Sequence, residues 1–120
     1  MSSTLRAVIA AFAASILLAG CVTQSRFAPI GDARQPKPGT CPIDVFTGQP
    51  PQRDFVRVAR LDAHVENTFF VPQALSALLP SLKRQACLAG ADAIIDIKES
   101  RSMLIETQIY HVTATAIAYR

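Results

Sequence analysis

The longest apolar run of this chain lies at its N-terminus and limits what the chain can form. Residues 7–18 are apolar at every position except Ser15, and a single positive charge, Arg6, precedes them. About 12 apolar residues are too few to span a bilayer but are typical of the central region of a secretory signal peptide. No later run approaches the roughly 20 residues that a span requires. The sequence therefore excludes a polytopic membrane protein and predicts that residues 1–20 are a cleaved signal peptide.

The apolar run closes on the sequence Leu18-Ala19-Gly20-Cys21. A large aliphatic residue, two small residues and a cysteine in this order resemble the lipobox of bacterial lipoproteins. The resemblance implies cleavage before Cys21 and a mature chain whose first residue carries acyl chains such as palmitate. Two or three such chains, at about 0.8 kcal/mol per buried methylene, give a stable membrane anchor without a transmembrane helix. An ordinary signal peptide with a coincidental cysteine, or a cytosolic chain with an apolar start, is the alternative.

The residue after the lipidated cysteine bears on localisation. In Gram-negative lipoproteins an aspartate at this position favours retention in the inner membrane, whereas this chain has Val22. The resemblance therefore implies the periplasmic face of the outer membrane, with the periplasmic face of the inner membrane as the alternative.

Residues 21–40 are predicted to be a lipidated N-terminus followed by a flexible tether. They contain several prolines and glycines, charges of both signs and no apolar periodicity. Such a composition does not bury enough surface to offset the entropy lost on ordering. In the alternative interpretation, the cations Arg26, Arg34 and Lys37 contact anionic headgroups or cell-wall material, but Asp32 among them favours simple solvation.

Residues 41–120 are predicted to form one small α+β periplasmic domain. Apolar residues recur every three or four positions over residues 72–89, which indicates a helix that contains Pro80 and ends at Gly90. Alternation and β-branched residues predict four strands, at residues 43–46, 55–65, 92–98 and 105–119, with a turn at residues 100–102. The domain is thus β-α-β-β, with the helix packed on a three- to four-stranded mixed sheet whose last two strands are antiparallel.

The second half of the chain carries a further resemblance. The run LKRQACLAGADAIIDIKE, followed by ETQIYHVTATAIAY, resembles the helix–Gly-Ala-Asp-Ala–strand–strand segment of small bacterial envelope lipoproteins and YbjQ-like domains. The envelope stress-sensor lipoprotein RcsF is a more distant member of the same general shape. The resemblance covers about residues 55–120. It implies a compact domain that acts through contacts with partners, and it assigns no active site, ligand or reaction.

The cysteine count favours one disulfide. Once Cys21 is lipidated, Cys41 and Cys87 remain in an oxidising compartment, and an even pair in a small exported domain indicates a bridge. Such a bridge would join the N-terminal edge of the domain to the helix. The alternatives are a buried Cys87 with a free Cys41, and a redox-active pair, which the absence of a C-x-x-C spacing disfavours.

Two other patterns give candidate binding residues. His64 and His111 are the only histidines; if their strands are neighbours, they could bind a metal with Asp62 or a cysteine, although no close ligand spacing supports this. Phe69 and Phe70 are consecutive, so an extended backbone directs them to opposite faces. One of them then caps the core and the other is exposed as a possible anchor for a partner, or the loop wraps under the helix.

Enzymatic function and nucleic-acid binding are not expected. The sequence contains no nucleophile elbow, zinc-protease, phosphate-loop or dinucleotide motif. The net charge of +3 is too small and too mixed to indicate a nucleic-acid partner. The sequence predicts a lipid-anchored, non-enzymatic interaction or sensor module without a cofactor, which contacts another envelope protein or the cell wall. The alternative is a periplasmic lipoprotein that binds a metal or small ligand through His64 and His111.

Overall fold

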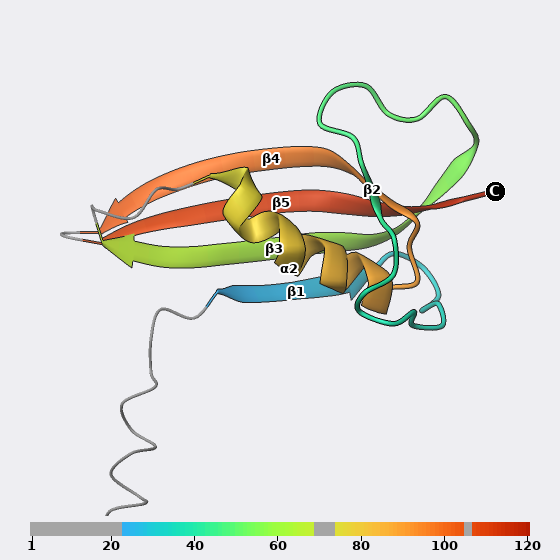
Figure 1. Ribbon diagram of the computed structural model, residues 1–120, viewed down its shortest axis with the longest axis horizontal. Coiled ribbons are helices and arrows are strands. Elements are labelled where there is room, and N and C mark those ends of the chain that lie inside the picture. The colour runs from blue at the N-terminus through green and yellow to red at the C-terminus, as the bar shows by residue number, and fades with distance from the viewer. Residues whose placement is uncertain (1–22, 69–73, 105–106) are drawn as a thin grey trace, which may run out of the picture.

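The computed structural model describes residues 23–68, 74–104 and 107–120, which form one helix and a five-stranded mixed sheet (Figure 1). The elements are β1 (Gln24–Pro29), β2 (Asp44–Val45), β3 (Phe55–Thr68), α2 (Leu75–Leu88), β4 (Ala93–Leu104) and β5 (Thr107–Tyr119). The predicted α+β class is confirmed, and the sheet has one strand more than the upper limit predicted. No helix in these described ranges has the length and apolarity to cross a membrane.

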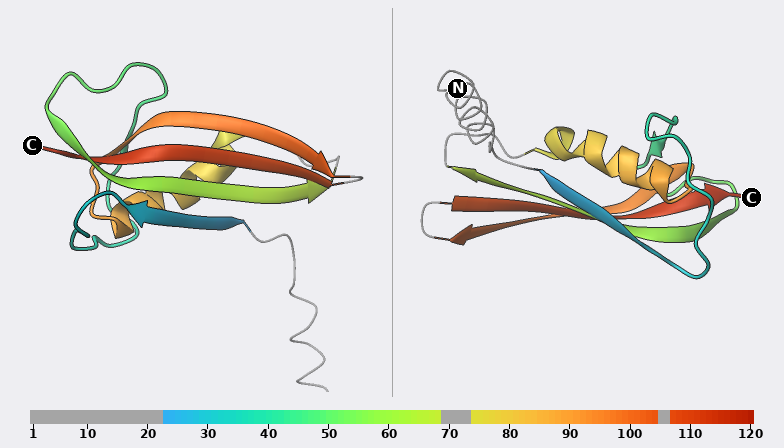
Figure 2. Two further views of the ribbon diagram at one scale, coloured as in Figure 1. Left: turned by 180° about the vertical axis from the view of Figure 1, so that it is seen from behind. Right: turned by 90° about the horizontal axis from the view of Figure 1, so that it is seen from below.

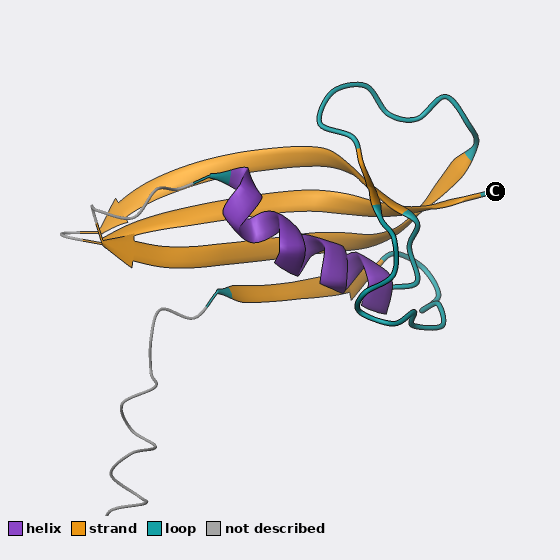
Figure 3. Cartoon of the chain, in the orientation of Figure 1, coloured by secondary structure: helices purple, strands orange, loops and turns teal. Residues whose placement is uncertain are grey.

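The strand order is β1-β3-β5-β4-β2. Both β3 and β4 are antiparallel to β5, which lies between them, so β3 and β4 run in the same direction, as is usual for two strands joined by a crossover through a helix. The edge strand β1 is antiparallel to β3, and the short β2 is parallel to β4. The helix covers one face of this sheet only (Figures 2 and 3).

The main core lies between α2 and the sheet. The helix residues Leu78, Leu82 and Ala86 are fully buried, and Pro80 lies within the single span of α2. The strand residues beneath them include a row of small side chains on β5, namely Val112, Ala114, Ala116 and Ala118. Alternation places all four on the face beneath the helix, and small side chains there allow a leucine-rich helix to approach closely.

A smaller cluster covers one end of the opposite face. Phe46, Phe55 and Tyr119 pack against the buried Ile95 and Ile117. The rest of this face, away from the helix, consists largely of polar residues that are half-buried or exposed.

The strand β1 corrects the prediction of a flexible tether. Residues 24–29 pair with residues 59–64 of β3, and Phe27 packs against the main core. The Nε2 of Gln85 on α2 donates a hydrogen bond of 3.2 Å to the hydroxyl of Ser25. An edge strand is ordered by a backbone ladder on one side and by a few side chains, so its composition can resemble that of a disordered segment.

Residues 30–41, which we call the strap, are also fixed to the domain. The backbone N–H of Lys37 donates to the carbonyl oxygen of Cys87 at 2.9 Å, and its Nζ donates to Asp92 at 2.5 Å. At the end of the strap, Cys41 forms the predicted disulfide with Cys87, with 5.9 Å between the two Cα atoms. The strap is therefore attached to the C-terminal end of α2. Because β1 and the strap belong to the folded domain, the prediction of a domain starting at residue 41 is wrong.

The turn expected at residues 100–102 is also absent. These residues belong to β4, which stays paired with β5 as far as Leu104 and Thr107. Serine is common in turns, but here cross-strand pairing with the long β5 outweighs that preference. The connection falls at residues 105–106, which lie outside the described residues.

Asp92 shows how the strap contributes to stability at different pH values. Partial burial raises the pKa of its carboxyl, but hydrogen bonds from Lys37 and from the Tyr119 N–H, together with the charges of Lys37 and Arg34, outweigh this effect. The pKa therefore lies below its usual value of 3.8. A carboxylate with a lowered pKa stabilises the fold fully above the unfolded-state value, and that contribution is lost as the pH falls through the folded-state pKa.

We expect Asp92→Asn to lower the free energy of unfolding at neutral pH by about 0.5–1 kcal/mol, a value reduced by solvent screening of this part-exposed pair. The difference from wild type should shrink as the pH falls below the folded-state pKa, because the wild-type carboxyl is then also neutral. Urea unfolding of both proteins at neutral pH and at a pH below the folded-state pKa measures this difference. Asp32→Asn, at an exposed carboxylate without an ion pair to the rest of the described chain, is the control and should change neither value. A pH-independent loss in Asp92→Asn would contradict the linkage.

Candidate functional site

The part of the sheet that faces away from α2 and is not covered by the Phe46, Phe55 and Tyr119 cluster is the candidate site, and we call it the open face. Alternation along β3 and β5 determines which side chains lie on it. They are Arg60, Asp62 and His64 on β3, and His111, Thr113 and Thr115 on β5.

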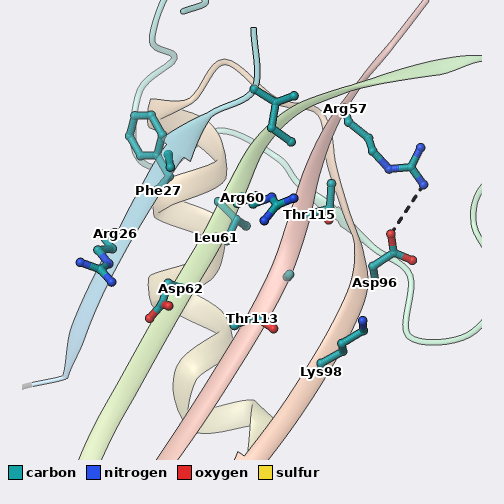
Figure 4. Close-up of a pocket in the computed structure, with 13 residues that line it drawn as sticks. Arg26, Phe27, Arg57, Arg60, Leu61, Asp62, Asp96, Lys98, Thr113 and Thr115 are labelled. Carbon is teal, nitrogen blue, oxygen red and sulfur yellow. Dashed lines mark ion pairs between the residues drawn. The ribbon is translucent and has the colours of Figure 1, made fainter.

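A groove of about 990 Å³ lies on the open face and crosses four strands (Figure 4). Its polar lining comprises four cations, two carboxylates and two hydroxyls: Arg26, Arg57, Arg60, Lys98, Asp62, Asp96, Thr113 and Thr115. The strand β1, expected to be part of a tether, thus forms one side of the groove.

Strand pairing sets the positions of these side chains. Arg26 pairs with Asp62, Asp62 with Thr113, and Thr113 with Lys98, so these residues form one row across the sheet. With about 4.8 Å between neighbouring strands, the Cα atoms of the cations at the two ends are about 14 Å apart. Arg60 pairs with Thr115 in the next row. The groove therefore has cations at both sides and hydroxyl groups on its floor.

Two irregularities add charges to this surface. The β3–β5 register shifts between Arg57 and Ala59, and the β4–β5 register shifts between Ile95 and Lys98. An extra residue in each strand places Arg57 and Asp96 at the groove, where their side chains form an ion pair with 3.7 Å between Nη2 and Oδ2. Asp96 has φ +53°, a conformation that aspartate tolerates better than most residues.

The charges of the groove are unequally paired. Asp96 faces Arg57, and Oδ1 of Asp62 lies 2.9 Å from Nε2 of His111. Arg26, Arg60 and Lys98 form no ion pair with any residue in the described ranges, and all three are exposed. Guanidinium and ammonium groups offer only hydrogen-bond donors. The groove is therefore suited to an anionic ligand.

The two histidines are direct cross-strand partners, as the sequence allowed. Their ring centroids are 6.1 Å apart and their planes are nearly perpendicular. His64 and Asp62 also line a smaller hollow of about 170 Å³ beside the groove. Within the described parts of the chain, however, no three or more histidine, cysteine, aspartate or glutamate side chains are grouped so that they could hold a metal ion.

The remaining candidate residues lie elsewhere. Cys41 and Cys87 are joined to each other, so neither offers a free thiol. Cys21, Phe69 and Phe70 lie outside the described residues. No protein-family model, curated protein or solved structure matches this chain. The evidence for function is therefore the sequence together with the geometry of the open face.

Proposed function

We propose that this chain is a lipid-anchored protein of the bacterial envelope that acts by binding rather than by catalysis. As an interaction or sensor module, it would use the open face as its binding surface. The observation that carries the proposal is the groove, in which Arg26, Arg60 and Lys98 have no ion-pair partner among the described residues and surround two threonine hydroxyls. An antiparallel sheet with one solvated face is common, but a concentration of unpaired cations there favours a charged partner.

The anchor follows from the Leu18-Ala19-Gly20-Cys21 sequence. Since β1 begins at Gln24, only three residues after Cys21, a lipid on that cysteine would lie within about 11 Å of the start of β1. The domain would thus be held at the membrane surface instead of at the end of a long tether. Val22 after the cysteine favours the periplasmic face of the outer membrane.

Intact mass tests the anchor. The protein purified from bacterial membranes is expected to have the mass of a chain that begins at Cys21 and carries acyl groups. On reduction it should gain two hydrogen atoms, because one disulfide opens. Cys21→Ser should carry no lipid and serves as the control. A wild-type chain without lipid would refute the anchor whatever its disulfide state.

A second candidate function is the binding of a small ligand or metal by His64 and His111. The cross-strand contact of their rings, with Asp62 beside His111, is the observation in its favour. Native mass spectrometry of the full chain with added Zn²⁺ discriminates between the two functions. One ion per chain that is lost in both His64→Ala and His111→Ala would support this function, and the absence of a bound ion would argue against it.

A further inference from the structure

We propose that the groove binds the anionic headgroups of the membrane that carries the anchor, so that the domain lies with its open face against the lipid surface. The placement at a membrane rests on the proposed lipidation of Cys21. The chemistry of the groove is independent of it.

The first argument is the match between the donors of the groove and a lipid phosphate. Arg60 offers a planar set of N–H donors that can bind two phosphate oxygens, and Lys98 adds a compact positive charge. In Figure 4 the side chain of Arg60 extends from β3 toward Thr115 on β5, with Arg26 and Lys98 at the two sides of the groove. The hydroxyls of Thr113 and Thr115 on the floor can donate to further phosphate oxygens.

The second argument is that each of the two carboxylates in the groove already has a partner within the domain. Repulsion between Asp62 or Asp96 and a phosphate would oppose binding if these groups were free. Asp96 is paired with Arg57, however, and Asp62 faces the imidazole of His111. Counting all polar lining residues, cations outnumber carboxylates four to two, so the field over the groove favours an anion.

The third argument is proximity to the anchor. Arg26 lies on β1, five residues after Cys21, so the chain between them extends at most about 18 Å. The lipid and the groove are therefore joined at the same edge of the sheet. An anionic cell-wall polymer offers similar chemistry, but a surface held this close to the anchor meets headgroups first.

Vesicle binding by the full chain tests the proposal. We compare wild type with Arg26→Gln/Arg60→Gln/Lys98→Gln, on vesicles of phosphatidylcholine alone and of phosphatidylcholine mixed with phosphatidylglycerol. The matched control is Lys83→Gln/Arg84→Gln/Arg120→Gln, which removes the same charge from the helix and the chain end. The segment that precedes β1, with any lipid on Cys21, is the same in all three proteins, so its own binding cancels in the comparison.

We expect the groove variant to bind the phosphatidylglycerol vesicles about 100-fold more weakly than wild type, at roughly fivefold per cation. Binding to pure phosphatidylcholine should be the same for all proteins, and the control variant should retain most of its preference for the anionic vesicles. The three replaced side chains are exposed and have no ion-pair partner in the described ranges, so the fold should persist. Equal thermal midpoints for the variant and wild type verify this.

Several results would overturn the proposal: equal losses in the two variants, no preference of wild type for phosphatidylglycerol, or binding of soluble anionic cell-wall fragments in place of vesicles. Failure of the anchor is a separate result. A chain that lacks lipid on Cys21 but shows groove-dependent vesicle binding would refute the proposed anchoring and retain the headgroup site. A lipidated chain without groove-dependent binding would refute the headgroup site and retain the proposed anchoring.

Discussion

Replacement of both disulfide cysteines, Cys41→Ala with Cys87→Ala, is expected to lower the free energy of unfolding by about 4 kcal/mol. The bridge joins residues that are 46 positions apart, so it removes many conformations from the unfolded chain. Cys87 is also fully buried, and its loss weakens packing at the end of α2. Domains of this size have a total stability of about 5–15 kcal/mol. The variant should therefore retain only a fraction of the wild-type stability.

Urea unfolding with and without a reductant measures this contribution. The reductant should move the midpoint of wild type close to that of the variant, while the variant itself should not respond. A variant as stable as oxidised wild type would mean that the contacts of the strap with α2 hold this end of the domain without the bridge.

The features that the sequence predicted well depend on the spacing of nearby residues or on the number of cysteines. The leucine spacing of α2 and the alternating alanines of β5 each identify one buried face, and together they give the main core. The disulfide followed from the even number of cysteines left after Cys21. The contact between His64 and His111 followed from alternation, on the condition that their strands are neighbours, which the β3–β5 pairing fulfils.

The groove could not be predicted in the same way. Its cations come from β1, β3 and β4, and only the register of the sheet brings Arg26 and Lys98 into one row. The positions of Arg57 and Asp96 depend on register shifts, which have no reliable signal in one sequence. The sequence places Arg26 in a predicted tether, because the strand that carries it has two consecutive apolar residues, Phe27 and Ala28, and no alternation to indicate its pairing.

The close contact between the strap and the helix end can be tested at one residue. Gly90 follows α2 with φ +77°, and a Cβ there would lie 2.7 Å from the carbonyl oxygen of Gln35 and 2.9 Å from Cβ of Arg34. Gly90→Ala is therefore expected to lower the free energy of unfolding by about 3 kcal/mol. Left-handed backbone in a residue with a side chain accounts for about 1–2 kcal/mol of this loss, and displacement of the strap for the rest.

Gly31→Ala is the matched control because Gly31 has a similar φ of +73°, but a Cβ there would meet no atom of the described residues within 4 Å apart from its chain neighbours. It should lose only the backbone contribution, about 1 kcal/mol. Urea unfolding of the two variants therefore separates backbone strain from the displacement of the strap. If Gly90→Ala were as mild as Gly31→Ala, the strap would be free to leave the helix end. Residues 30–41 would then behave as a flexible segment at this end of the domain, while β1 would stay paired with β3.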